Sequence, residues 1–165
     1  MSASTLLHAL FKYKAWANEE LFAAFEKVDS AAHKTERHTA IRVLNHVYVV
    51  DRIFAAHLSG ETHAYTGTNT PETPALEDLR RAVSESDRWY VEYVGALPPE
   101  LLSESLAFTF TDGATGRMSR EEILAHVATH GDYHRGAVGR IMSQLSVAPF
   151  TVYLHKAEPQ RCERT

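Results

Sequence analysis

The sequence predicts an all-α protein, a four-helix bundle with a small β-hairpin before its last helix. Three observations support this fold class. Four long segments carry apolar residues at spacings of three and four, a long loop spans residues 61–73, and one short segment alternates at period two. A length of 165 residues suits one domain, here residues 1–165, with a sizeable core. The predicted helices cover about residues 4–28, 39–58, 74–94 and 119–145.

The first two helices each have an apolar face and a recognisable boundary. Ser4 is a suitable N-cap for the first helix, and Gly60 is a suitable C-terminal stop for the second. On the second helix, His46 falls between Val43 and Val50 at spacings of three and four. We therefore expect the His46 side chain to point into the bundle.

The loop over residues 61–73 is long enough to carry the chain along the bundle before the third helix begins. Thr73 and Pro74 suit an N-cap followed by a first helical residue, and Gly95 with Pro98 suits the end of that helix.

A short helical turn over residues 99–102 is expected next, followed by the hairpin. Residues 106–111 alternate in polarity, residues 112–116 form a turn, and Arg117 with Met118 suits a short return strand. Ser119 and Glu122 then match a capping box that opens the fourth helix. The tail is first apolar, which predicts packing against the bundle, and is polar over residues 156–165; the apolar residues are Phe150, Val152, Tyr153 and Leu154.

The composition excludes several classes of function. A net charge of -4 argues against a nucleic-acid partner, which usually meets a basic face. No segment has the roughly 20 apolar residues of a membrane helix, and no signal peptide is evident. The single cysteine, Cys162, cannot form an internal disulfide. These features predict a cytoplasmic protein without a membrane partner.

Three of the ten histidines recur at intervals of four in the last predicted helix: His126, His130 and His134. Each step of four rotates a helix by about 40°, so the three side chains lie near one face. Neutral imidazole is the commonest nitrogen ligand for zinc and related metals. The other histidines are expected on the surface or in loops, with His57 closest to an exception; they are His8, His33, His38, His57, His63 and His155.

His46 is the candidate for the missing ligand, because it lies on another helix and is predicted to face inward. The favoured set is His46, His130 and His134, which leaves an open fourth position as catalytic metal sites do. His126 could replace a ligand, orient one, or line the mouth of the pocket. Against this hypothesis, an isolated inward histidine such as His46 is usually a hydrogen-bonded core residue without a metal.

Asp51, Asp132 and Arg135 are charged residues within or beside the histidine-bearing helices. They could form ordinary surface ion pairs. Alternatively, either aspartate could orient a ligand histidine, and Arg135 could bind an anionic group of a substrate.

Three glycines, Gly131, Gly136 and Gly139, lie inside the fourth helix, where each costs up to about 1 kcal/mol relative to alanine. They suggest close approach of another backbone, from a neighbouring helix, a second subunit, or a ligand.

Two segments resemble the DinB family of metal-dependent helical bundles, which is related to bacillithiol and mycothiol S-transferases. One segment, residues 44–54, includes His46 and Asp51. The other, residues 126–136, is similar to the H-x3-H-x3-H-R-G signature of the family. Ala137 departs from the pattern, because glutamine often follows Arg-Gly in the family.

This resemblance implies an up-down-down-up bundle with a long crossover, commonly a homodimer. It implies a divalent metal ion, zinc or nickel, held by His46, His130 and His134, with His126 outside the ligand set. By analogy it also implies a low-molecular-weight thiol as a second cofactor or substrate.

Three functions remain open at this point. The first is a metal-dependent enzyme, a thiol S-transferase or a hydrolase, that activates a thiol or water toward a small electrophile. The second is a non-catalytic metal-binding or stress-response protein. The third is a dimeric interaction module whose histidine cluster holds no metal.

Overall fold

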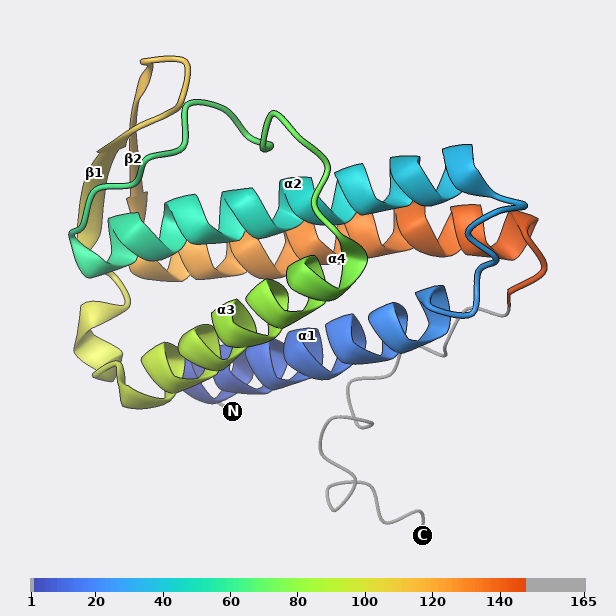
Figure 1. Cartoon of the computed structure of the whole chain (residues 1–165). Coiled ribbons are helices and arrows are strands. Elements are labelled where there is room, and N and C mark those ends of the chain that lie inside the picture. Colours follow the sequence, from blue (N-terminus) through green and yellow to red (C-terminus); the bar gives the residue numbers. More distant parts are fainter. Residues whose placement is uncertain (1, 148–165) are drawn as a thin grey trace, which may run out of the picture.

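The computed structural model describes residues 2–147, and in that range the chain forms four long helices, one helical turn and one hairpin. The helices surround a shared core (Figure 1). Their bounds are α1 Ala3–Phe25, α2 Lys34–Ser59, α3 Leu76–Ala96 and α4 Arg120–Gln144, and the turn η1 covers Pro99–Leu101.

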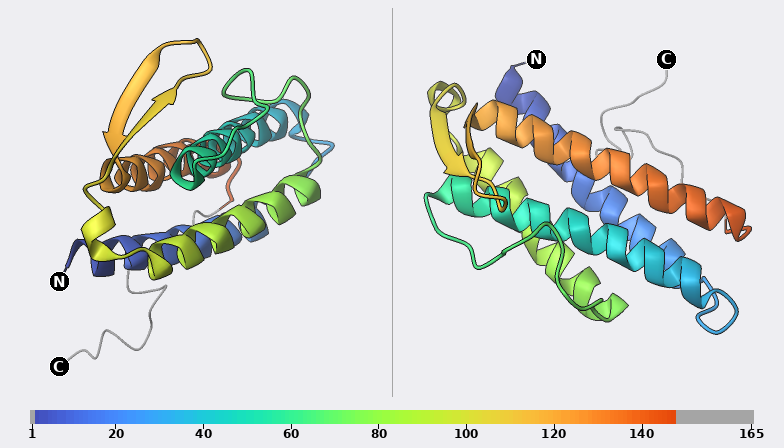
Figure 2. Two further views of the ribbon diagram at one scale, coloured as in Figure 1. Left: turned by 90° about the vertical axis from the view of Figure 1, so that its left-hand side faces the viewer. Right: turned by 90° about the horizontal axis from the view of Figure 1, so that it is seen from above.

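The helices run up, down, down and up in chain order, as predicted. Helix α1 packs against α3 and α4, and α2 packs against α4 and α3. A long crossover returns the chain from the end of α2 to the start of α3, so these two helices run in the same direction (Figures 1 and 2). The antiparallel neighbours α2 and α4 are the two helices that carry the candidate metal ligands.

The apolar core has two parts along the bundle axis. One part lies toward the hairpin and includes Phe11, Phe54 and Leu124. The other lies toward the opposite end and includes Phe22 and Met142. Between them, buried polar residues from all four helices form a polar layer that separates the two apolar parts: Lys14, Asn18, Asp51, Asp87 and Arg135.

The hairpin leads directly into α4. Strands β1 (Ser105–Thr109) and β2 (Thr115–Ser119) pair antiparallel, and Phe108 on β1 is buried against the bundle. At the turn, Gly113 has φ +88°, a conformation that favours glycine. Ser119 and Glu122 form the predicted capping box, with the Ser119 hydroxyl accepting from the Glu122 N–H.

Several predicted boundaries were wrong by a few residues. Helix α1 starts at an N-cap on Ser2 rather than Ser4 and ends at Phe25 rather than Val28. Helix α2 starts five residues early, at Lys34, and α3 starts at Leu76, after Ala75. The first turns of α2 are polar, so hydrophobic periodicity did not extend to them, and α3 begins without a side-chain cap.

The predictions for the tail, including its apolar residues, Cys162 and residues 156–165, lie outside the described residues. Within residues 2–147, none of the helices combines the length and apolar character needed to cross a bilayer.

Candidate metal centre

His46 of α2 and His130 and His134 of α4 come together on adjacent antiparallel helices. Each can offer one ring nitrogen so that the three atoms lie within 4.8 Å of one another. All three side chains are half-buried. Two helices that are distant in sequence thus bring together the residues predicted as ligands.

The spacing of the ring nitrogens suits one small ion. The Nε2 atoms of His46 and His130 are 3.1 Å apart. Two nitrogens bound to one tetrahedral ion at 2.0–2.1 Å would be about 3.3 Å apart, so this pair needs only a small adjustment. The His134 ring centroid lies 4.8 Å from that of His46 and 4.5 Å from that of His130.

The protonation of these rings also suits metal binding. Burial, together with the neighbouring His134 and His46, lowers the pKa of His130 to about 3. Burial and His46 also lower the pKa of His134. His130 and His134 are therefore neutral at pH 7, and a neutral imidazole has the free lone pair that a metal requires.

The surroundings of Nδ1 are defined for His46 and for His130. Nδ1 of His46 lies 2.7 Å from the backbone carbonyl of Thr68. A carbonyl can only accept, so Nδ1 carries the hydrogen and the Nε2 lone pair faces the cluster. Nδ1 of His130 is buried and has no hydrogen-bond partner among residues 2–147. A set of three imidazole ligands fits a divalent ion of the zinc or nickel kind.

His126 lies beside this cluster, one turn before His130. Its ring stacks on His130 at 5.4 Å between centroids and packs against Phe54 at 5.1 Å. His126 is the most exposed of the four residues, and the partial burial of its ring against these neighbours lowers its pKa. The structure therefore places His126 at the solvent side of the three histidines rather than among them.

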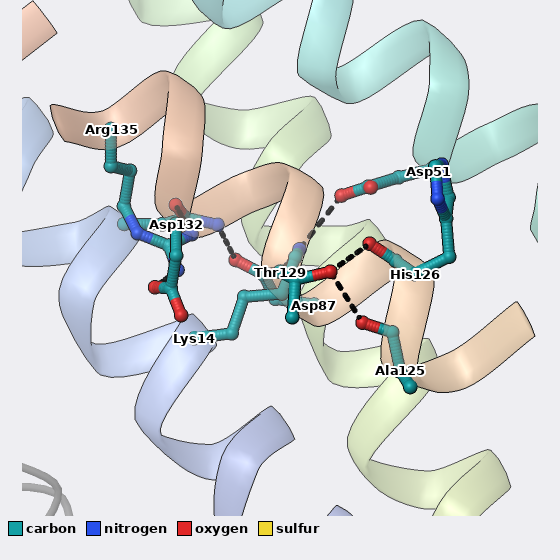
Figure 3. Close-up of polar contacts among 9 residues, drawn as sticks. Lys14, Asp51, Asp87, Ala125, His126, Thr129, Asp132 and Arg135 are labelled. Atoms are coloured by element: carbon teal, nitrogen blue, oxygen red, sulfur yellow. Dashed lines mark hydrogen bonds and ion pairs between the residues drawn. The ribbon is translucent and has the colours of Figure 1, made fainter. Parts of the chain in front are cut away.

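Asp51 and Arg135 make their contacts in the polar layer of the core (Figure 3). The Lys14 ammonium lies 2.7 Å from an Asp51 oxygen. Arg135 donates to Asn18 at 2.9 Å and also pairs with Asp132. Neither aspartate forms a hydrogen bond with a histidine among the described residues, and Arg135 is only 6% exposed. The contacts of Asp51 with Lys14 and of Arg135 with Asn18 thus join α2 and α4 to α1.

The polar layer also contains residues that the sequence analysis did not single out: Lys14, Asn18 and Asp87. Lys14 is 2.5 Å from an Asp87 oxygen, and Asn18 donates to the other Asp87 oxygen at 2.7 Å. With Asp51 and Arg135, the layer joins all four helices. The signal was available in the sequence, because Lys14 and Asn18 lie at helical spacing between Phe11 and Leu21 on an apolar face.

Burial affects the two charges at the centre of this layer in opposite senses. It raises the pKa of the Asp51 carboxyl to about 6, although Lys14 opposes the change. Burial alone would lower the pKa of Lys14, but Asp51 and Asp87 raise it above its ordinary value. Both groups are therefore charged at pH 7.

The three glycines of α4 have different surroundings. A Cβ on Gly131 would lie 3.0 Å from Nη1 of Arg135 and 3.5 Å from Cε of Lys14, so this glycine makes room for the polar layer. The close approach is by side chains and not by a backbone as predicted. At Gly136 and Gly139, no described atom lies within 4 Å of an added Cβ.

The histidines outside the cluster are not all on the surface. His57 is half-buried and stacks on Phe108 at 4.9 Å, and His63 packs against His57 at 5.3 Å. His8 is half-buried and close to Gly95, where an added Cβ would be 3.4 Å away. His38 is exposed, as predicted, and His155 lies outside the described residues.

Comparisons with known proteins cover nearly the whole chain. The model of the DinB family matches residues 1–164. Protein DinB of Bacillus subtilis (strain 168) is 26% identical over 152 residues, which cover 84% of this chain and 86% of the relative. No solved structure matches the chain. The resemblance seen in the two histidine segments is thus confirmed over nearly the whole chain, and the chain belongs to the DinB family.

Proposed function

We propose that this protein binds one divalent metal ion through His46, His130 and His134 and is a metal-dependent enzyme. The observation that carries the proposal is the convergence of three ring nitrogens within 4.8 Å from two helices. Zinc and nickel are the favoured ions, since both accept imidazole ligands. Three protein ligands leave a position for an exogenous group, which is the arrangement of catalytic rather than structural zinc sites.

The chain's own contribution is to present neutral, oriented ligands beside solvent. Burial keeps His130 neutral, and the Thr68 carbonyl orients the His46 ring. His126 stands on the solvent side, where it would contact a group that enters the open position. An ion bound there would supply Lewis-acid chemistry by lowering the pKa of a thiol or a water molecule.

Activation of a small thiol, for transfer to an electrophile, is favoured over hydrolysis. Among residues 2–147, the three histidines contact other histidines, the Thr68 carbonyl and the Tyr133 ring, and no carboxylate hydrogen-bonds to them. A thiol bound to such an ion would lose its proton outright at pH 7, whereas bound water, with a pKa near 7, would stay partly protonated.

The second candidate is a non-catalytic metal-binding protein. The three histidines lie outside both apolar parts of the core, and Lys14 pairs with Asp51 and Asp87 in the polar layer between them, so the core does not depend on an ion. The enzyme proposal therefore expects a folded protein after chelation, with retained helical circular dichroism. Unfolding on removal of the metal would instead favour a structural role for the ion.

Metal content tests the proposal directly. Protein purified without a metal-affinity tag is expected to carry close to one zinc or nickel per chain by elemental analysis. His130→Ala is expected to lose the metal, whereas His38→Ala, which removes an exposed histidine of α2, is expected to retain it. A wild-type protein that takes up no zinc, nickel or manganese would support the interaction module and contradict the proposal. Loaded protein can then be tested with glutathione, bacillithiol, mycothiol and electrophilic acceptors.

A further inference from the structure

The crossover between α2 and α3 lies along α2 (Figure 1). The Thr68 carbonyl meets Nδ1 of His46. Further along the crossover, the carbonyls of Thr70 and Glu72 accept from Nη1 of Arg42 at 2.7 and 3.2 Å. The contacts therefore move toward the start of α2 as the crossover proceeds from Thr68 to Glu72, so the crossover runs antiparallel to α2.

Asn69 connects this segment to α2 through both ends of its amide. Its Oδ1 accepts from Nδ2 of Asn45 and from the N–H of Thr70, and its Nδ2 donates to the Arg42 carbonyl at 3.0 Å. Asn45 is 2% exposed and donates also to the Thr70 hydroxyl at 2.7 Å. We call Asn45, Asn69 and Thr70 the amide clamp. Its members flank Thr68 and His46 in sequence, so it fixes how the Thr68 carbonyl lies against the ring.

We propose that Asn69 is a positioning residue for the metal centre, and that the amide clamp holds the His46 tautomer that presents Nε2 to the ion. The inference rests on the proposed metal site. A neutral imidazole carries one hydrogen, which can lie on either nitrogen. The Thr68 carbonyl selects the form with hydrogen on Nδ1. Removal of a group that orients a ligand histidine typically lowers metal affinity 10- to 100-fold.

The coupling acts in both directions. An ion on Nε2 withdraws electron density from the ring and makes Nδ1–H a better donor to Thr68. If the clamp favours the ion, the ion must favour the clamped crossover by the same factor. The crossover is therefore a part of the protein whose order follows metal occupancy, and its amide hydrogens should exchange more slowly in the loaded protein.

The test compares Asn69→Ala with Thr66→Ala, which alters an exposed side chain of the same crossover. We expect Asn69→Ala to weaken zinc binding about 10- to 100-fold in a competition titration, and Thr66→Ala to leave it unchanged. Nitrogen-15 spectra of the histidine rings in metal-free protein should show His46 with hydrogen on Nδ1 in wild type and a mixture of tautomers in Asn69→Ala. Should Asn69→Ala fail to fold, Thr70→Val removes one arm of the clamp and should give a smaller loss in the same direction.

Equal zinc affinity in Asn69→Ala and Thr66→Ala, with an unchanged His46 tautomer, would overturn the inference. The tautomer measurement needs no metal, so it separates the two proposals. If wild type bound no ion, the proposed function would fail, while a shift of the His46 tautomer in Asn69→Ala would still support the clamp. An unshifted tautomer would then reject both.

Discussion

Lys14 carries a positive charge into the centre of the bundle, where its side chain is 1% exposed. Asp51 and Asp87 lie on either side of its ammonium group. Replacing the lysine with an apolar residue leaves two buried carboxylates without the cation that contacts both of them. Breaking a buried pair in this way typically costs about 3–5 kcal/mol, so about that loss is expected here.

We therefore expect Lys14→Met to lower the free energy of unfolding by about 3–5 kcal/mol in urea titrations followed by circular dichroism. Lys27→Met, at an exposed position just after α1, is the matched control and should change it by less than about 0.5 kcal/mol. Similar stability of the two variants would show that the polar layer does not depend on the Lys14 charge.

Single residues differ in how far the sequence could predict them. His130 and His134 follow from their spacing on one helix, and His46 follows from its position on an apolar face. The contact from Thr68 could not be predicted, because a backbone carbonyl leaves no mark on residue identity. The positions of Asp51 and Arg135 were also not determined by sequence, since a charge beside a histidine helix can face solvent, the site or the core.

Two glycines of helix α4 lie in different surroundings. Gly131 faces Lys14 and Arg135, whereas Gly136 faces open space among the described residues. Alanine favours a helix interior over glycine by up to about 1 kcal/mol. At Gly131 the new methyl group would press on an arginine that Asn18 and Asp132 already hold.

Gly136→Ala is therefore expected to stabilise the protein by about 0.5–1 kcal/mol, and Gly131→Ala to give no gain or a loss. Thermal unfolding of the two variants beside wild type measures the difference. An equal gain at both positions would mean that Arg135 and Lys14 shift aside freely, contrary to the close contacts of the polar layer.

Elements with strong local signals were predicted well. The capping box of Ser119 and Glu122 and the alternation in β1 set the start of α4 and the hairpin. The start of α2 was missed because residues 34–38 are polar, and polar residues form a helical first turn as readily as a loop. Local chemistry therefore defines an element's end only where a cap or breaker is present.

In the molecule as a whole, the buried polar side chains form one layer across the bundle. The polar layer of Lys14, Asp87 and Arg135 lies between the two apolar parts of the core. Gly131, which makes room for that layer, is the neighbour in sequence of His130.

The periodicity of four segments predicts a bundle, but which helices become neighbours depends on the crossover and on packing. The pairing of α2 with α4, which brings the candidate metal ligands together, is a property of the fold and is not visible in either helix alone.

X-ray absorption at the metal edge tests the central claim most directly. Protein purified without an affinity tag and without added thiol should show three imidazole nitrogens and one oxygen at about 2.0–2.1 Å from the ion. His130→Ala should lose this spectrum, and His38→Ala should keep it. A fourth imidazole, which would bring His126 into the ligand set, or a protein sulfur at about 2.3 Å would contradict the assignment of His46, His130 and His134 as the complete set of protein ligands.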